Sequence, residues 1–163
     1  MSDAAHGRRG TARVAAVQAL YQIEFTHALP SAVIEEFSRH RFGDPGGDES
    51  QVPDKIDAAL FADIVNGAAA RLGDLDAMVS PLLAQGWRIE RIDPVLRACL
   101  RAGAFELVGR ADVPAKVAIN EYVGVARRFF GGGEPGVVNA VLDQLARKLR
   151  PTEFGHVGTG ADG

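Results

Sequence analysis

The residue types that most often act in catalysis are few in this sequence and widely scattered. The four histidines, His6, His27, His40 and His156, lie at no spacing that is typical of metal ligands. Cys99, the only cysteine, falls on the apolar side of its segment. A small buried side chain is a better interpretation of that position than a nucleophile. We therefore expect no catalytic residue and no metal site.

A glycine-rich segment and two isolated acids are the remaining candidates for a nucleotide-binding or catalytic site. GGGEPG (131–136) has the glycine content of a phosphate-binding loop. No strand is expected before it and no Lys-Ser/Thr follows, so a nucleotide cofactor is not expected, although a loop here could touch an RNA backbone. Glu106 and Glu121 stand far from other acids in the sequence, and no acid/base pair can be named. The sequence therefore predicts a protein that is not an enzyme and has no cofactor.

Basic residues, in contrast, gather near the N-terminus. Arg8, Arg9 and Arg13 stand at and just before the first expected helix. The planar guanidinium group can bond two phosphate oxygens at once, which suits this cluster to RNA. The alternative is an ordinary solvated helix end, and three arginines alone do not decide between the two.

A second basic group follows helical spacing in the C-terminal half. Lys116, Asn120 and Arg127 stand at i, i+4 and i+11, which places them on one helix face. A basic residue and an aromatic residue follow them directly. Single-stranded RNA is bound by backbone charge and by base stacking, which this group could supply. A core position for the aromatic side chain remains the alternative. The candidate RNA-binding residues here are Lys116, Asn120, Arg127, Arg128 and Phe129.

Seven helices are expected to position these residues, because apolar residues recur with helical spacing and no segment alternates as a strand does. Thr11 is a usable N-cap for the first helix, Asp93 before Pro94 marks the start of the fifth, and Pro114 opens the sixth. The segment 41–53 has the composition of a loop. The fold class is therefore all-α, with two packed helical subdomains of three and four helices.

The expected organisation of the chain follows from these signals. Residues 1–10 are expected to be a flexible N-terminus that carries arginines. A helical domain spans 11–150, with an N-terminal subdomain of about 11–72 and a C-terminal subdomain of about 73–150. Residues 151–163, rich in glycine, are expected to be a disordered tail.

Apolar spacing also predicts which side chains face the core. In the first helix these are Val14, Val17, Leu20, Tyr21 and Phe25. A partner-binding position is the alternative for the tyrosine. In the fifth helix the expected core residues are Leu96, Cys99, Leu100, Gly103 and Leu107, and Trp87 before that helix is expected to be in the core.

Composition and charge limit the class of protein. Of the 163 residues, 47% are hydrophobic, which is enough for a buried core, and charged residues interrupt every apolar stretch well before the length of a membrane span. One cysteine fits a reducing cytoplasm. The net charge is −3, but residues 28–80 are acidic, whereas 81–150 are basic. Such asymmetry favours a polyanion-binding face, and ordinary solvated faces are the alternative.

Four segments together resemble the NusB family of transcription antitermination factors. RRGTARVAAVQALYQIEF (8–25) is similar to the family's first helix, and LRACLRAGAFEL (96–107) to its Leu-Arg-x-x-x-Tyr/Phe-Glu-Leu helix. VPAKVAINEYVGVARRFF (113–130) and VVNAVLDQLAR (137–147) resemble its Val-Pro-x-Lys-Val-x-Ile-Asn-Glu and Phe-Val-Asn-Gly-Val-Leu-Asp stretches. The matches occur in the family's order over about residues 8–150.

The resemblance implies a function and a set of contacts. NusB-type proteins pair with NusE, and the pair binds the single-stranded boxA element of nascent RNA. The complex, with RNA polymerase and other Nus factors, resists premature termination, notably on ribosomal RNA operons. The family's RNA-contacting groups match the three N-terminal arginines, Lys116 and Phe129, and its tyrosine near NusE matches Tyr21.

The sequence departs from the family at three positions and leaves one alternative open. Val137 replaces an aromatic residue, Ala140 replaces a glycine, and Leu96 stands where some relatives carry a partner-facing acid. NusB-like domains also occur fused to ribosomal RNA methyltransferases, and we expect no such domain here. The competing function is a scaffold that binds only protein.

Overall fold

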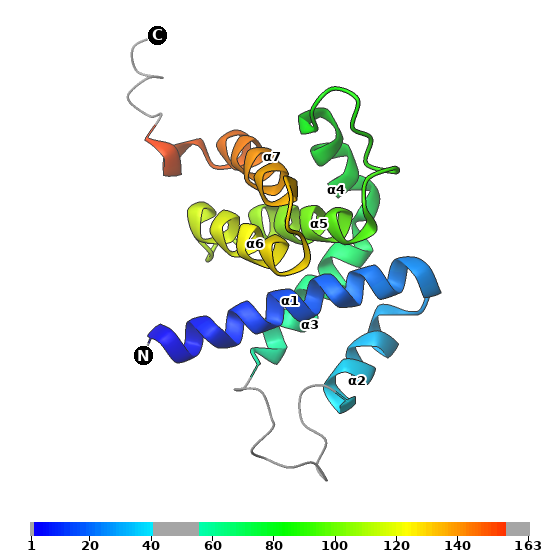
Figure 1. Cartoon of the computed structure of the whole chain (residues 1–163). Helices are drawn as coiled ribbons and strands as arrows, with labels where there is room; N and C mark the ends of the chain where they lie inside the picture. Colours follow the sequence, from blue (N-terminus) through cyan, green and yellow to red (C-terminus); the bar gives the residue numbers. More distant parts are fainter. Residues whose placement is uncertain (1, 41–55, 156–163) are drawn as a thin grey trace. The chain divides into compact units, whose positions relative to one another are not determined.

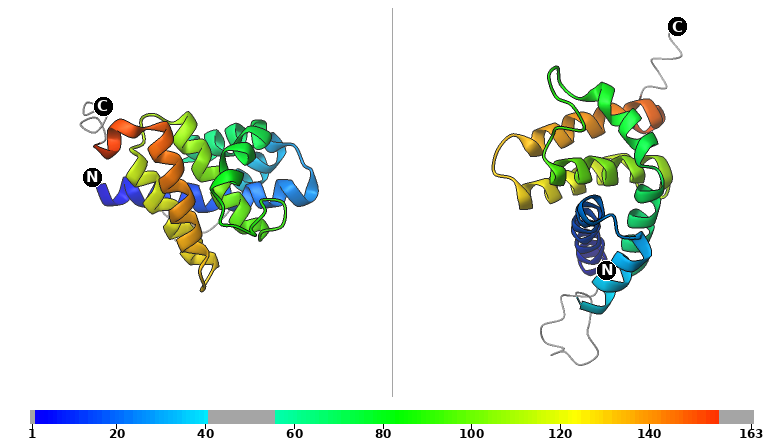
Figure 2. Two further views of the ribbon diagram at one scale, coloured as in Figure 1. Left: turned by 90° about the horizontal axis from the view of Figure 1, so that it is seen from above. Right: turned by 90° about the vertical axis from the view of Figure 1, so that its right-hand side faces the viewer.

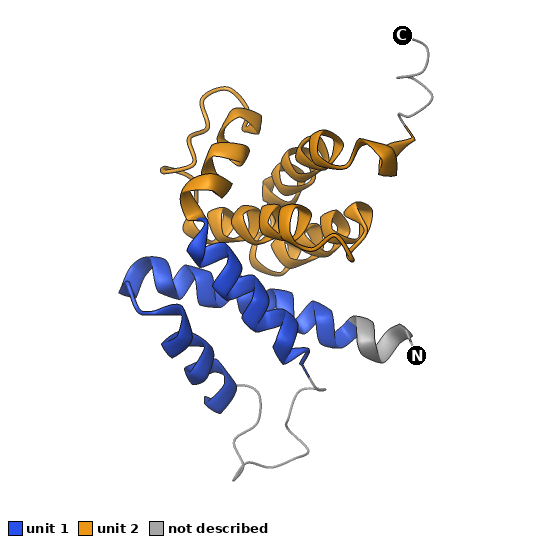
Figure 3. Ribbon diagram, turned by 180° about the vertical axis from the view of Figure 1, so that it is seen from behind, with its two compact units in different colours: residues 1–71 blue, residues 72–163 orange. Residues whose placement is uncertain are grey.

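The computed structural model describes residues 2–40 and 56–155, and these fold entirely as helices and connections, which confirms the all-α prediction. Contacts divide the chain into two compact units, residues 1–71 and 72–163 (Figure 3). In the first, the helices are α1 (Ser2–Thr26), α2 (Pro30–His40) and α3 (Ala58–Ala70) (Figure 1). In the second they are α4 (Leu72–Val79), α5 (Pro94–Gly109), α6 (Ala115–Phe129) and α7 (Glu134–Leu149), with short 3-10 helices η2 (Ser80–Leu82) and η3 (Pro151–Phe154).

The first unit is a small three-helix assembly in which each helix packs against the other two. Phe37 of α2 and Phe61 of α3 are both buried, and their rings stack with centroids 5.5 Å apart. Asp57 ends the preceding segment as the N-cap of α3, because its carboxylate accepts a hydrogen bond of 2.9 Å from the Leu60 N–H. Capping and aromatic packing therefore fix where α3 begins and which face it turns to α2.

Helix α1 differs from the prediction at both ends. It begins at Ser2, so residues 2–10 are helical and not a flexible arm. Thr11 is not an N-cap: its hydroxyl donates to the Gly7 carbonyl 2.9 Å away, a bond made inside a helix. At the other end Tyr21 and Phe25 are 40% and 60% exposed, not in the core. The buried face is mostly alanine (Ala12, Ala15, Ala16, Ala19), which a search for large apolar side chains overlooks.

The second unit is built around α5, which packs against α4, α6 and α7. Helix α5 starts as predicted, with Asp93 as N-cap and Pro94 as its first residue. The Asp93 carboxylate accepts from the backbone N–H groups of Val95 and Leu96, at 2.7 and 3.4 Å. The predicted core residues of this helix, Leu96, Cys99, Leu100, Gly103 and Leu107, are all buried. Burial raises the pKa of the Cys99 thiol to about 12, as expected of a core cysteine and not of a nucleophile.

Two contacts show how closely the helices of this unit approach. A Cβ added at Gly103 of α5 would lie 2.5 Å from Cδ1 of Leu142, a fully buried residue of α7. A side chain at position 103 would therefore force the buried Leu142 side chain to move. Helices α6 and α7, joined by the short glycine-rich segment, lie side by side in both views of Figure 2 and pack against each other.

The remaining differences lie at connections. The third and fourth helices separate at Arg71, within one residue of the expected boundary between the subdomains, and Gly73 lies inside α4. Trp87 is 43% exposed, so the prediction that it lies in the core is wrong. Residues 151–154 of the expected disordered tail form η3, whereas 156–163 and the predicted loop 41–53 lie outside the described residues.

Candidate RNA-binding residues

Helix α6 presents the predicted polar group on its exposed side. Lys116, Asn120, Arg127, Arg128 and Phe129, here called the α6 surface, are all exposed. The opposite side is buried through Ala118, Ile119, Tyr122, Val123 and Ala126, which explains the helical spacing of both sets. Lys116 and Arg127 lie eleven residues apart along the helix, a distance of about 16 Å at 1.5 Å per residue.

The C-terminal end of α6 suits the charges that it carries. Arg127 and Arg128 lie in the last turn, where cations interact favourably with the helix dipole. Phe129 is the last residue of the helix and its side chain is 36% exposed. The fully buried alternative for Phe129 is thus excluded, and its ring is partly accessible to a base.

The first two N-terminal arginines are accessible and anchored within unit 1. The carbonyl of Arg8 accepts a hydrogen bond of 3.2 Å from the N–H of Asp57. The side chain of Arg9 is 50% exposed, and its Nε lies 3.7 Å from the Asp57 carboxylate. An exposed ion pair of this length is weak, so a phosphate group could readily replace the Asp57 carboxylate. We call Arg8 and Arg9 the N-terminal arginine pair.

Arg13 does not belong with that pair in this structure. It is 1% exposed and is one of the largest fully buried side chains of the described residues. A buried guanidinium must be bonded within the protein, and Arg13 does make such an interaction. The interpretation of Arg13 as a phosphate contact is therefore not supported, and its role is in the fold.

Near the C-terminal end of α1, apolar side chains are exposed to solvent. The rings of Tyr21 and Phe25 lie in contact, with centroids 4.9 Å apart and planes tilted by 47°. Leu29, three residues after the helix, is 71% exposed. An exposed aromatic pair with an exposed leucine nearby is the type of group that anchors protein interfaces.

Two arginines of α5 serve the fold. Arg101 binds Asp76 of α4 through two hydrogen bonds of 2.8 and 2.7 Å. Arg97 donates instead to two backbone carbonyls, those of Ile89 and Ile92, at 2.9 and 3.1 Å. Neither guanidinium group is presented to RNA.

A structural role of Arg150 is not indicated by any pattern in the sequence. Its guanidinium donates to the carbonyls of Glu106, Leu107, Arg110 and Val113, at the end of α5 and in the following turn. Arg150 also bonds Glu153, whose carboxylate accepts from the N–H of Ala115 at 2.8 Å, the first residue of α6. We call Arg150 and Glu153 the C-terminal clamp. It joins residues about 40 positions apart, which spacing along the chain cannot reveal.

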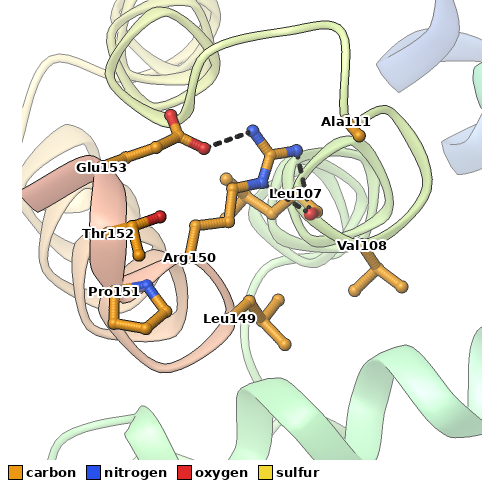
Figure 4. Close-up of a pocket in the computed structure, with 8 residues that line it drawn as sticks. All are labelled: Leu107, Val108, Ala111, Leu149, Arg150, Pro151, Thr152 and Glu153. Carbon is orange, nitrogen blue, oxygen red and sulfur yellow. Dashed lines mark hydrogen bonds and ion pairs between the residues drawn. The ribbon is translucent and has the colours of Figure 1, made fainter.

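The C-terminal clamp lines an open pocket of about 400 Å³ (Figure 4). The pKa of Glu153 is lowered, mainly by the Ala115 N–H and further by Arg150. Figure 4 shows the Arg150 guanidinium pointing between Glu153 and the carbonyl of Leu107. Because the charged groups of the pocket bond each other and the backbone, the pocket is a structural feature and not a candidate ligand site.

The described part of the chain also bears on metal binding and on membrane insertion. Among the side chains that the structure describes, those of residues 7–40 and 56–155, no three His, Cys, Asp or Glu residues are grouped as metal ligands would be. No helix in those ranges combines the length and the apolar character that crossing a membrane requires.

Comparison with known proteins gives one consistent result. Residues 10–147 match the model of the NusB family. The transcription antitermination protein NusB of Rhodopseudomonas palustris (strain BisB18) is 47% identical over 147 residues, which cover 90% of this chain and 86% of that protein. NusB of Maricaulis maris is 48% identical over 148 residues, 90% of each chain. The solved structure of T. maritima NusB matches with a TM-score of 0.72 and 25% identity, over 90% of this chain and 96% of that one.

Proposed function

This chain belongs to the NusB family of transcription antitermination proteins, and from that premise we propose that it binds the boxA element of nascent RNA together with NusE. In this role it acts in the cytoplasm as a binding protein without catalysis, and its complex with RNA polymerase and other Nus factors suppresses premature termination on ribosomal RNA operons. The α6 surface is the observation that carries the proposal.

The α6 surface has the chemistry that single-stranded RNA requires. Lys116, Arg127 and Arg128 supply three exposed cations for phosphates, and Asn120 lies between them with both donor and acceptor atoms. Phe129, partly exposed at the end of the helix, supplies a ring for one base. The N-terminal arginine pair adds two cations from the other unit.

The number of exposed cations also supports a role for a partner protein. The chain has a net charge of −3, and the two candidate groups contain five cations, so RNA binding by this protein alone is expected to be modest. NusE would add further contacts to RNA. We assign its binding to the exposed aromatic pair Tyr21 and Phe25, because aromatic side chains give interfaces much of their binding energy.

The test is a set of titrations of labelled boxA RNA with this protein, with NusE and with both. The two proteins together should bind more tightly than either alone, and by thermodynamic linkage RNA should tighten the protein pair by the same factor. The double variant Lys116→Ala/Arg127→Ala should reduce the dependence of log affinity on log salt by about 1.4, at roughly 0.7 for each phosphate contact.

Two further variants separate the surfaces. Tyr21→Asp should lose NusE binding and keep the weak RNA binding of the isolated protein. Arg147→Ala, which removes an exposed arginine already paired with Asp143 in α7, is the matched control and should change neither. If NusE leaves the RNA affinity unchanged, or if the α6 double variant binds as the wild type does, the proposal is wrong; binding of NusE without RNA would identify a scaffold that binds only protein.

A further inference from the structure

The turn between η2 and α5 presents a tryptophan and two arginines that no role described above includes. Trp87 is 43% exposed, and Arg88 and Arg91 are exposed beside it. Within the described residues neither of these two guanidinium groups has an ion-pair partner. Figure 1 shows the segment as an open connection between α4 and α5.

The turn is held in a defined conformation by its backbone. Gly86 has φ +91°, which favours glycine, and the Trp87 N–H donates to the Ala84 carbonyl at 3.0 Å. The N–H groups of Arg91 and Ile92 both donate to the Arg88 carbonyl, at 2.9 and 3.1 Å. Two short turns, 84–87 and 88–92, therefore hold this connection in shape, and the exposed residues Trp87 and Arg88 lie where the two turns meet.

Buried residues of the same turn fix it to the fold. Ile89 and Ile92 are 8% and 9% exposed. Arg97 of α5 donates to the carbonyls of both, so it ties the turn to the first part of that helix. With this anchoring, little conformational entropy is lost when Trp87 takes part in binding.

We propose that Trp87, Arg88 and Arg91 form a second contact for single-stranded RNA, in which the indole stacks on a base and the two arginines bind phosphates. The inference rests on the proposed RNA-binding function and adds a site to it. An aromatic ring flanked by cations is the arrangement that binds single strands without base specificity. Glu90 and Asp93 are the acids of the same connection and balance the two arginines in formal charge, but the Asp93 carboxylate is engaged as the N-cap of α5.

The surroundings of the ring favour RNA over a protein partner. Trp87 is flanked by exposed residues that are small or polar, Ala84, Gln85, Gly86 and Arg88. A protein interface has an apolar centre of several side chains, whereas one isolated ring suffices to stack on a base. A protein ligand for the turn is therefore an outcome of the test and not the proposal.

Trp87 is the single tryptophan of the chain, so it reports its own contact. The full-length protein is titrated with a fluorescein-labelled, single-stranded RNA of mixed sequence and about 12 nucleotides, within the site sizes of single-strand binders. RNA anisotropy and indole fluorescence are recorded in parallel. We expect the indole to be quenched with the same midpoint at which the anisotropy rises, and a duplex of equal length to give much less quenching.

Variants measure what each part contributes. Trp87→Ala should weaken RNA binding about five- to hundredfold, and Trp87→Phe much less, because a ring remains. Arg88→Ala/Arg91→Ala should lower the salt dependence by about 1.4. Glu90→Gln, the control in the same turn, should bind at least as tightly as the wild type. Unfolding in urea with an unchanged midpoint shows that the variants remain folded.

The possible failures are distinguishable. If the anisotropy rises but the indole is not quenched and Trp87→Ala binds normally, the second site is wrong while the proposed function stands. If no RNA binds at all, both fail. If NusE, added without RNA, shifts the indole emission and Trp87→Ala weakens only NusE binding, the turn belongs to a protein interface and the inference is overturned.

Discussion

The role of the N-terminal arginines is a point on which the prediction from the sequence and the structure differ, and it can be tested directly. The sequence treats Arg8, Arg9 and Arg13 as one cluster, whose removal would lower the salt dependence of RNA binding by about 2. The structure separates them, because Arg13 is 1% exposed whereas the Arg9 side chain is 50% exposed. Arg8→Ala/Arg9→Ala should therefore lower it by about 1.4, at roughly 0.7 for each phosphate contact.

Arg13→Ala should behave in the opposite way. Its replacement removes the interaction that Arg13 makes within the protein and leaves a cavity where a long side chain was packed. The free energy of unfolding should fall by about 1–3 kcal/mol or more, and the salt dependence of RNA binding should not change. In the double variant, loss of the Arg9–Asp57 ion pair should cost about 1 kcal/mol or less, because the pair is largely exposed.

The assays are RNA titrations at several salt concentrations and equilibrium unfolding in urea, for both variants. Arg39→Ala is the control, since it removes an exposed arginine of α2 that pairs only locally with Glu35. If Arg13→Ala reduces the salt dependence and leaves the urea midpoint unchanged, Arg13 contacts RNA and the assignment made from its burial is refuted.

Three more predictions follow from particular contacts. Phe129→Ala should weaken RNA binding by about 1–3 kcal/mol in a titration and change the urea midpoint little, because the ring is 36% exposed; a large loss of stability with normal binding would contradict stacking. Gly124→Ala should stabilise the protein by up to about 1 kcal/mol, because the added Cβ meets no atom. In Gly103→Ala the clash with Leu142 should cancel or exceed that gain. Equal urea midpoints for the two variants would refute the packing argument. The pKa of Glu153 is lowered in the folded state, so its contribution to stability is present at neutral pH and is lost as the pH falls below about 4.5. Glu153→Gln should therefore lose less stability in acid than the wild type does. If the free energies of unfolding of the two proteins fall in parallel with pH, the carboxylate bond is not maintained.

The sequence predicted well those features whose cause lies close by in the chain. Helix α5 is the best example, because Asp93, Pro94 and a run of apolar residues at helical spacing determine both its start and its buried face. The exposed stripe of α6 was likewise readable from the spacing of Lys116, Asn120 and Arg127. Spacing succeeds most fully in α6, which has one buried and one exposed side; α5 is buried on nearly all sides, and spacing identified only part of its buried residues.

Features that depend on distant residues could not be predicted in this way. In α1 the buried face is mostly alanine, so Tyr21 and Phe25 were expected in the core and are exposed. Trp87 is exposed because Ile89 and Ile92 anchor its turn through Arg97, an arrangement that only the folded backbone shows. Arg13 has the charge of an RNA contact, and only the surrounding fold shows that it is buried.

The C-terminal clamp also has a consequence for how the protein is made. Arg150 binds the carbonyl of Arg110, 40 residues earlier, so the last turn of α5 lacks its final hydrogen bonds until the end of α7 has been synthesised. At about 5–20 residues per second, the ribosome takes roughly 2–8 s to cover that interval. The first unit is complete by residue 71 and can fold while the second is still incomplete. We therefore expect nascent chains stalled before residue 150 to hold a folded N-terminal unit and a C-terminal unit that a protease still cleaves.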